Sequence, residues 1–171
     1  HLGAIKIYRI YNDLRFAKDK PPYKTHFGLY FPRLQPHYRG GYYLHLSPEE
    51  SFAGGGFFNP DTKDLLRIRQ EIAAEGAVFS QIMSSAPIKK YFGEELFGEA
   101  VKTAPKGFSK DDPMIEYLRK KQFLLKRDFP TSAVLEADFL EEVVATFLAM
   151  RPFYDFMTGA LTTDLNGEPL Y

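Results

Sequence analysis

The segment between residues 9 and 24 concentrates side chains that can bind an anion. It holds two arginines and three lysines: Arg9, Arg15, Lys18, Lys20 and Lys24. A guanidinium offers a planar pair of donors to a phosphate or carboxylate, whereas an ammonium acts as a point charge. Three aromatic residues that could stack on a ring lie among the cations: Tyr11, Phe16 and Tyr23. Pro21 and Pro22 stiffen the loop, which limits the entropy lost on binding.

Two histidines, His26 and His45, are the candidate catalytic residues of the chain. A histidine can act as a general acid or base, or it can hydrogen-bond a neighbour such as Tyr43. A metal site would need a third ligand such as His37 or Glu49, and no H-x-x-x-H or H-E-x-x-H spacing occurs. We therefore expect no metal site and no cofactor. Nucleophilic catalysis is poorly supported, because the chain has no cysteine and no G-x-S-x-G motif.

The sequence thus predicts one ligand site in which the basic loop covers a sheet face that carries histidine and tyrosine. The residues expected to bind the ligand are Arg9, Arg15, Lys18, Lys20, Tyr23, Lys24, His26 and Tyr43.

The composition indicates a single folded domain. The chain has 171 residues, of which 44% are hydrophobic, and this is enough to bury a sizeable core. The absence of cysteine fits a reducing compartment, so we expect a cytoplasmic protein. No apolar run approaches the length of a membrane helix, and we expect no membrane contact.

The charges are neutral in total but unevenly distributed. Residues 1–47 hold eight Lys and Arg against two Asp, a net charge of +6, and residues 48–171 carry the opposite net charge. Such a division favours an anionic partner for the first segment. The alternative is that the cations of the first segment pair with the acidic remainder when the chain folds.

The first third of the chain predicts strands. Residues 5–11 are rich in β-branched and aromatic residues, and residues 26–31 alternate between apolar and more polar positions. Similar patterns follow at 41–46 and 51–58, after short linkers that favour antiparallel pairing. We expect a sheet of about four strands. Three consecutive glycines from Gly54 to Gly56 indicate a β-bulge or a close approach by a ligand or by backbone. Of these we expect a bulge under a packed helix, and a phosphate-binding loop is the weaker alternative.

The remainder predicts mostly helices. Expected helices begin at Asn59-Pro60, at Val78, at Asp112-Pro113 and at Asp138, and the last continues beyond Pro152. A further strand is expected between 123 and 127. The predicted fold is a single α+β domain over 1–171, with strands mostly in 1–58 and helices mostly in 59–171 covering the apolar face. The expected core residues are Phe27, Leu29, Phe31, Leu44, Leu140, Val144, Phe147 and Leu148.

Several segments resemble a known family. They are RIYNDLRFAKDKPPYKTHFG, GYYLHLSPEESFAGGGFFNP, RQEI, APKGFSKDDPMIEYLRKKQFLLKR and DFLEEVVATFLAMRPFYDFM. Together they resemble the domain of unknown function 2461, found in bacterial and some fungal and plant proteins. The resemblance implies a helical segment ahead of the first strand, so we expect this chain to be the main part of a longer protein. It implies no activity.

Three functions are compatible with these patterns. The first is recognition of a small molecule bearing a phosphate or carboxylate, with or without a reaction that positioned cations and a histidine would support. The second is a nucleic-acid-binding module, although the pI near 7.1 and the absence of known motifs count against it. The third is a protein-interaction scaffold with an acidic partner. The oligomeric state does not follow from the sequence.

Overall fold

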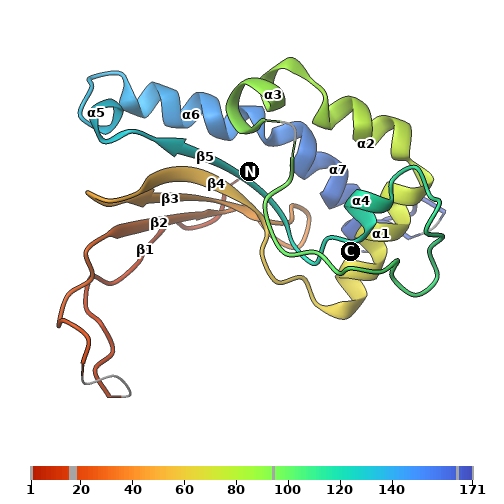
Figure 1. The fold of residues 1–171 in the computed structure, drawn as a ribbon, viewed down its shortest axis with the longest axis horizontal. Helices are drawn as coiled ribbons and strands as arrows, with labels where there is room; N and C mark the ends of the chain where they lie inside the picture. Colours follow the sequence, from red (N-terminus) through yellow and green to blue (C-terminus); the bar gives the residue numbers. More distant parts are fainter. Residues whose placement is uncertain (1, 16–18, 94, 165, 171) are drawn as a thin grey trace.

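The alternating segments of the first third form an antiparallel sheet, to which one later segment adds an edge strand. The computed structural model describes residues 2–15, 19–93, 95–164 and 166–170. The strands pair in the order in which they occur in the chain (Figure 1). They are β1 (Lys6–Ile7), β2 (Phe27–Pro32), β3 (Gly41–Leu46), β4 (Ser51–Phe57) and β5 (Phe123–Phe129). The sheet therefore has five strands, against about four expected, because residues 123–129 complete it.

The helices follow β4, with β5 inserted between the fourth and the fifth. They are α1 (Thr62–Ala74), α2 (Gly76–Met83), α3 (Ala86–Phe92), α4 (Ile115–Leu118), α5 (Thr131–Val134), α6 (Phe139–Ala149) and α7 (Arg151–Thr162). α1 begins later than predicted, because Asp61 rather than Asn59 is the N-cap and its carboxylate accepts the Asp64 N–H at 2.8 Å. Pro152 lies in the first turn of α7, where a missing N–H costs nothing.

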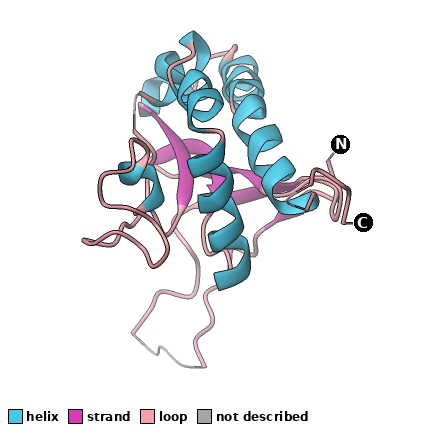
Figure 2. Ribbon diagram, turned by 90° about the vertical axis from the view of Figure 1, so that its right-hand side faces the viewer, coloured by secondary structure: helices cyan, strands magenta, loops and turns pink. Residues whose placement is uncertain are grey.

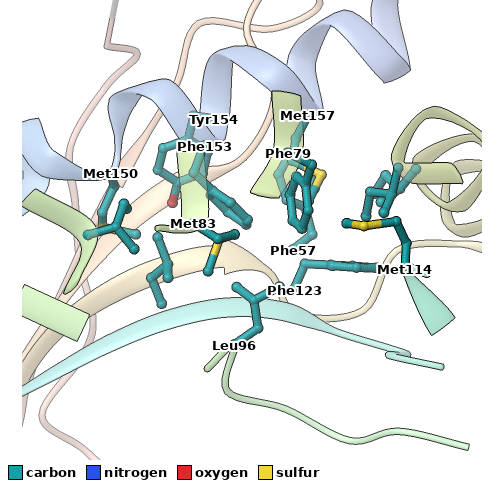
Figure 3. Packing of buried hydrophobic residues seen from close by; sticks show 14 of the residues in the cluster. Phe57, Phe79, Met83, Leu96, Met114, Phe123, Met150, Phe153, Tyr154 and Met157 are labelled. Carbon is teal, nitrogen blue, oxygen red and sulfur yellow. The ribbon is translucent and has the colours of Figure 1, made fainter. Parts of the chain in front are cut away.

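The helices lie on one face of the sheet, where alternate strand residues form the core. Phe57, Phe123 and Leu125 face α1, α2 and α7, whose buried residues include Phe79 and Phe153 (Figure 3). A smaller cluster beside it joins strand residues to α6; its buried members are Leu44, Ala53, Phe129 and Val143. The fold is thus α+β, with helices on the apolar face as the alternation predicts.

The three glycines in β4 allow a close approach, and they do not form a bulge. Each residue of β4 is paired in unbroken register with β5. Gly55 has a φ of 155°, and a Cβ there would clash with the Gly41 carbonyl and the Tyr154 hydroxyl. The fully buried Tyr154 donates its hydroxyl hydrogen to that same carbonyl. The expected bulge is therefore wrong, because glycine is needed here to admit a tyrosine from α7.

The predicted core is partly wrong. Leu44 is buried, and Leu29, Phe31 and Phe147 are half-buried against the smaller cluster. Four others are exposed: Phe27, Leu140, Val144 and Leu148. α6 packs on the sheet through Val143, Thr146 and Phe147 instead, so its apolar stripe is wider than the face it buries. Phe27 is exposed because it is the first residue of β2 and does not belong to the main core cluster.

Two arginines from the first third bind the helical layer. Arg33 is buried and donates to Asp155 at 2.6 Å and to Thr158 at 3.1 Å, both on α7. Arg39 pairs with Asp64 on α1. Pairing within the fold thus accounts for these two cations. Among the described residues, no helix has the length and apolar character required to cross a membrane.

Candidate functional site

The described residues of the basic segment, 9–15 and 19–25, form a two-stranded arm that continues the pairing of β1 and β2. Lys24 donates its N–H to Ile10 O at 2.7 Å, and Asn12 donates its N–H to Pro22 O at 2.9 Å. The rings of Tyr11 and Tyr23 lie 5.5 Å apart. The arm extends away from the rest of the molecule in both views (Figures 1 and 2). It does not cover the sheet as predicted, because its backbone hydrogen bonds are made within the arm.

The predicted cations of the arm differ in their burial and in their partners. Arg15 lies in its outer part and binds Asp13 at 2.7 Å, with both side chains largely exposed. Within the described residues, Arg9, Lys20 and Lys24 form no ion pair, and only Lys24 is half-buried. Lys18 falls outside the described residues, as does Phe16. Lys24 is therefore the half-buried cation at the base of the arm.

The sheet face opposite the helices, called here the open face, brings the predicted histidines together. His26 stacks on His45 with centroids 4.4 Å apart, and His45 stacks on Phe52 at 5.0 Å. The Tyr43 hydroxyl lies 3.2 Å from His45 Nδ1, within hydrogen-bond distance. Paired register across β2, β3 and β4 produces this row, since Gly28, His45 and Phe52 are cross-strand neighbours. His26, His45 and Tyr43 thus lie together as predicted.

The electrostatics of the open face favour neutral side chains. Partial burial and the neighbouring His26 lower the pKa of His45, which favours its neutral imidazole. Burial raises the pKa of the Tyr43 hydroxyl. Lys126 lies 4.6 Å from the Phe52 ring centroid, but its charge is neutralised by Glu50 at 2.6 Å and Asp128 at 2.9 Å. The open face is therefore aromatic with little uncompensated charge.

A groove of about 440 Å³ lies at the base of the arm, between the end of the sheet and α5. Lys24, Thr25 and His26 form one wall of it. The rest of the lining comes from Phe27, Leu46, Ser47, Pro48, Ser51, Thr131, Val134 and Leu135. Most of the surface inside is apolar. The groove therefore combines an apolar floor with a cation that has no ion pair among the described residues.

The serines of the groove are occupied by the β3–β4 turn. The Ser47 hydroxyl accepts the N–H groups of Glu49 and Glu50 at 3.1 and 3.3 Å. The Ser51 hydroxyl donates to Ser47 O at 3.0 Å. Among the described residues, the side chains of Lys24, Thr25 and His26 make no hydrogen bond, so their polar atoms remain for a ligand, as does the Ser47 hydroxyl hydrogen.

Sequence reasoning missed the apolar part of this site. Val134 and Leu135 belong to the short α5 and the residue after it, which no periodic pattern marks. Phe27 and Leu46 could have indicated it, because they are cross-strand partners at the ends of β2 and β3, where the short α5 covers only part of them.

A second hollow of about 210 Å³ lies beside α6 and contains Arg127 and three carboxylates. Arg127 is already bound by Glu142 at 2.6 Å and Thr146 at 2.7 Å, so no free cation faces this hollow. In the part of the chain that the structure describes, no three His, Asp or Glu side chains gather as a metal site requires.

Comparison with known proteins places the chain in a family without an assigned activity. The family model described as "Conserved hypothetical protein (DUF2461)" matches residues 3–156. No curated protein matches the chain, and no solved structure matches it either.

Proposed function

The chain belongs to the DUF2461 family, and we propose that it binds a small molecule in which a phosphate or carboxylate is joined to an apolar body. The anionic group would contact Lys24 and His26 at the base of the arm. The apolar body would lie in the groove between the sheet and α5. The observation that carries this proposal is the position of Lys24, which has no ion pair in the described chain, in the wall of a mostly apolar groove.

Lys24 is suited to an anion because it lies in the wall of a mostly apolar groove. It is half-buried, and among the described residues no carboxylate forms an ion pair with its ammonium. A charge-assisted hydrogen bond at such a site is stronger than one between neutral groups. The backbone of Lys24 is held by its bond to Ile10, so the side chain starts from a fixed position. Binding there loses less conformational freedom than at a free loop.

The apolar lining defines the rest of the ligand. Leu46 and Val134 pack on the smaller core cluster, so this part of the groove is preformed. Phe27 and Leu135 are largely exposed and would be covered by a ligand. Burial of apolar surface contributes about 0.8 kcal/mol per methylene. An anion without an apolar body would forgo this contribution and bind weakly.

Thermal unfolding in the presence of a matched ligand series tests the proposal. Octanoate, octyl phosphate, octanol and inorganic phosphate are added separately to the wild type. The two amphipathic anions should raise the melting temperature, whereas octanol and inorganic phosphate should raise it less. Lys24→Gln should lower the affinity for the two amphipathic anions about tenfold, because one charge-assisted bond is lost. The rise in melting temperature that these anions cause should therefore be smaller in this variant.

Lys20→Gln is the matched control, since Lys20 is an exposed lysine of the same arm. It should bind the anions as the wild type does. Equal shifts with octanol and octanoate, or equal losses in the two lysine variants, would contradict the assignment of the anion to Lys24.

A second candidate function is supported by the aromatic row on the open face. Single-stranded nucleic acids bind sheet surfaces by stacking bases on exposed aromatic rings beside cations. Here Tyr8 packs near Tyr43 at 6.1 Å, beyond which the row continues to His45 and Phe52. Arg9 and Lys20 on the arm would contact phosphates. A fluorescent oligo(U) titration checks this, and binding through phosphates must weaken steeply as salt is raised.

A further inference from the structure

The outer side of α6 carries an apolar row that nothing in the described chain covers. Leu140, Val144 and Leu148 recur every four residues, and their exposed fractions are 69%, 47% and 62%. An exposed row of three large aliphatic residues on one helix is unusual for a surface that faces only water. It marks an interaction surface, called here the α6 row.

The orientation of α6 fixes where the row points. One side of the helix binds β5, because Arg127 reaches Glu142 and Thr146. The face toward the sheet packs through Phe147, whose ring lies 5.6 Å from Phe31 and 4.9 Å from Tyr42. The α6 row follows Phe147 around the helix and points away from β5. It is therefore accessible to another molecule along its whole length.

We propose that the α6 row is the contact surface of a symmetric dimer, in which α6 of a second copy lies antiparallel to it. The row has the same spacing in both directions from Val144. An antiparallel pair centred on Val144 therefore places Leu140 of one copy against Leu148 of the other. Such a two-fold contact uses one surface twice and closes on itself, which yields a dimer and no longer assembly.

The charges at the two ends of the row complement each other in this arrangement. The start of α6 is acidic, with Glu136, Asp138 and Glu141 exposed and without an ion pair among the described residues. Arg151 is exposed at the other end, and its own partner Asp155 is 3.7 Å away and bound more closely by Arg33. The antiparallel pair brings Arg151 of each copy to the acidic end of the other. A parallel pair would place like charges together, so charge favours the antiparallel arrangement.

Single-cysteine variants test this geometry directly, because the chain contains no cysteine. Under mild oxidation, Val144→Cys should form a disulfide-linked dimer, since position 144 lies on the two-fold axis. Leu140→Cys alone should cross-link poorly, because its two copies would be separated by about 12 Å along the helices, too far for a disulfide. A mixture of Leu140→Cys and Leu148→Cys should cross-link efficiently. Lys63→Cys, on the exposed side of α1, gives the background.

Sedimentation analysis provides a second measurement that does not require cysteine. The wild-type mass should rise toward that of a dimer as the concentration increases, whereas Val144→Glu should remain a monomer with unchanged circular dichroism. The proposal is overturned if Val144→Cys cross-links no faster than Lys63→Cys. It is equally overturned if Leu140→Cys cross-links to itself as fast as Val144→Cys, which would show a parallel pair, or if the wild type stays a monomer throughout.

Discussion

At the scale of single residues, Gly55 shows how a position without a side chain shapes the core. A Cβ at this position would collide with the Gly41 carbonyl and displace the Tyr154 hydroxyl. We predict that Gly55→Ala lowers the free energy of unfolding by about 2–4 kcal/mol, from strained backbone and a broken buried hydrogen bond. Chemical denaturation measures the change. Gly159→Ala, where the added Cβ meets no atom within 4 Å, should instead be neutral or stabilising.

His45 should make stability depend on pH. Its pKa is lowered in the folded protein, first by burial and then by His26, from an ordinary value of 6.5. The unfolded chain therefore binds more protons than the folded chain just below that value, and folding stability falls as the pH is lowered through it. Above that range the contribution of His45 does not change. Melting temperatures at pH 7.5 and 5.5 should differ less in His45→Gln than in the wild type.

His37→Gln is the control for this pH effect, because His37 is exposed and lies outside the histidine stack. It should retain the wild-type difference between the two melting temperatures. A difference that His45→Gln leaves unaltered would show that other groups produce the pH dependence.

The sequence indicates some of the site residues and not others, for physical reasons. Period-2 alternation places Tyr43 and His45 on one face whatever the neighbours are, and the structure has them there. The partner of a charged side chain can lie far away in the sequence. The sequence alone therefore could not distinguish the role of Arg33 from that of Lys24. One is buried against α7, and the other has no ion pair in the described chain.

At the scale of elements, α6 and α7 show which apolar residues the fold uses. Leu161 is completely buried, whereas Leu140 is mostly exposed. We predict that Leu161→Ala lowers the free energy of unfolding by about 2–5 kcal/mol, through lost burial and a cavity. Leu140→Ala should change it by less than about 0.5 kcal/mol, when measured at a concentration where the chain is monomeric. Similar losses in the two variants would mean that the α6 row is part of the core.

Strands and long helices were predictable because their apolar periods are local. Residues 26–31, 41–46 and 51–58 were expected as strands, and β2, β3 and β4 lie there. The face of α6 that is buried was not predictable, because Val143, Val144, Phe147 and Leu148 satisfy a helical period on two overlapping sides. The contacts of α6 with the sheet select between them, through Phe147 against Phe31 and through Thr146 to Arg127 of β5.

At the scale of the whole molecule, the basic residues of the first third have two different structural roles. Arg33 joins the first third to α7 through Asp155, whereas Arg15 on the arm pairs with the exposed Asp13, two residues away in the chain. We predict that Asp155→Ala lowers the free energy of unfolding by about 1–3 kcal/mol, because it leaves the buried Arg33 with one partner fewer. Asp13→Ala should cost about 0–1 kcal/mol, as exposed pairs do. Urea denaturation of both variants distinguishes these values, and equal losses would contradict the different roles of the two arginines.

The measurement that tests the central claim most directly is a backbone NMR titration of the wild type with octanoate. The account predicts saturable shifts at the residues that line the groove on both sides, from Lys24 to Phe27 and from Thr131 to Leu135. The amides of Tyr43 and Phe52 on the open face should shift much less, and Lys24→Gln should need about ten times more octanoate for the same shifts. Shifts confined to the open face, or no saturable shift at Lys24 and Val134, would contradict the account.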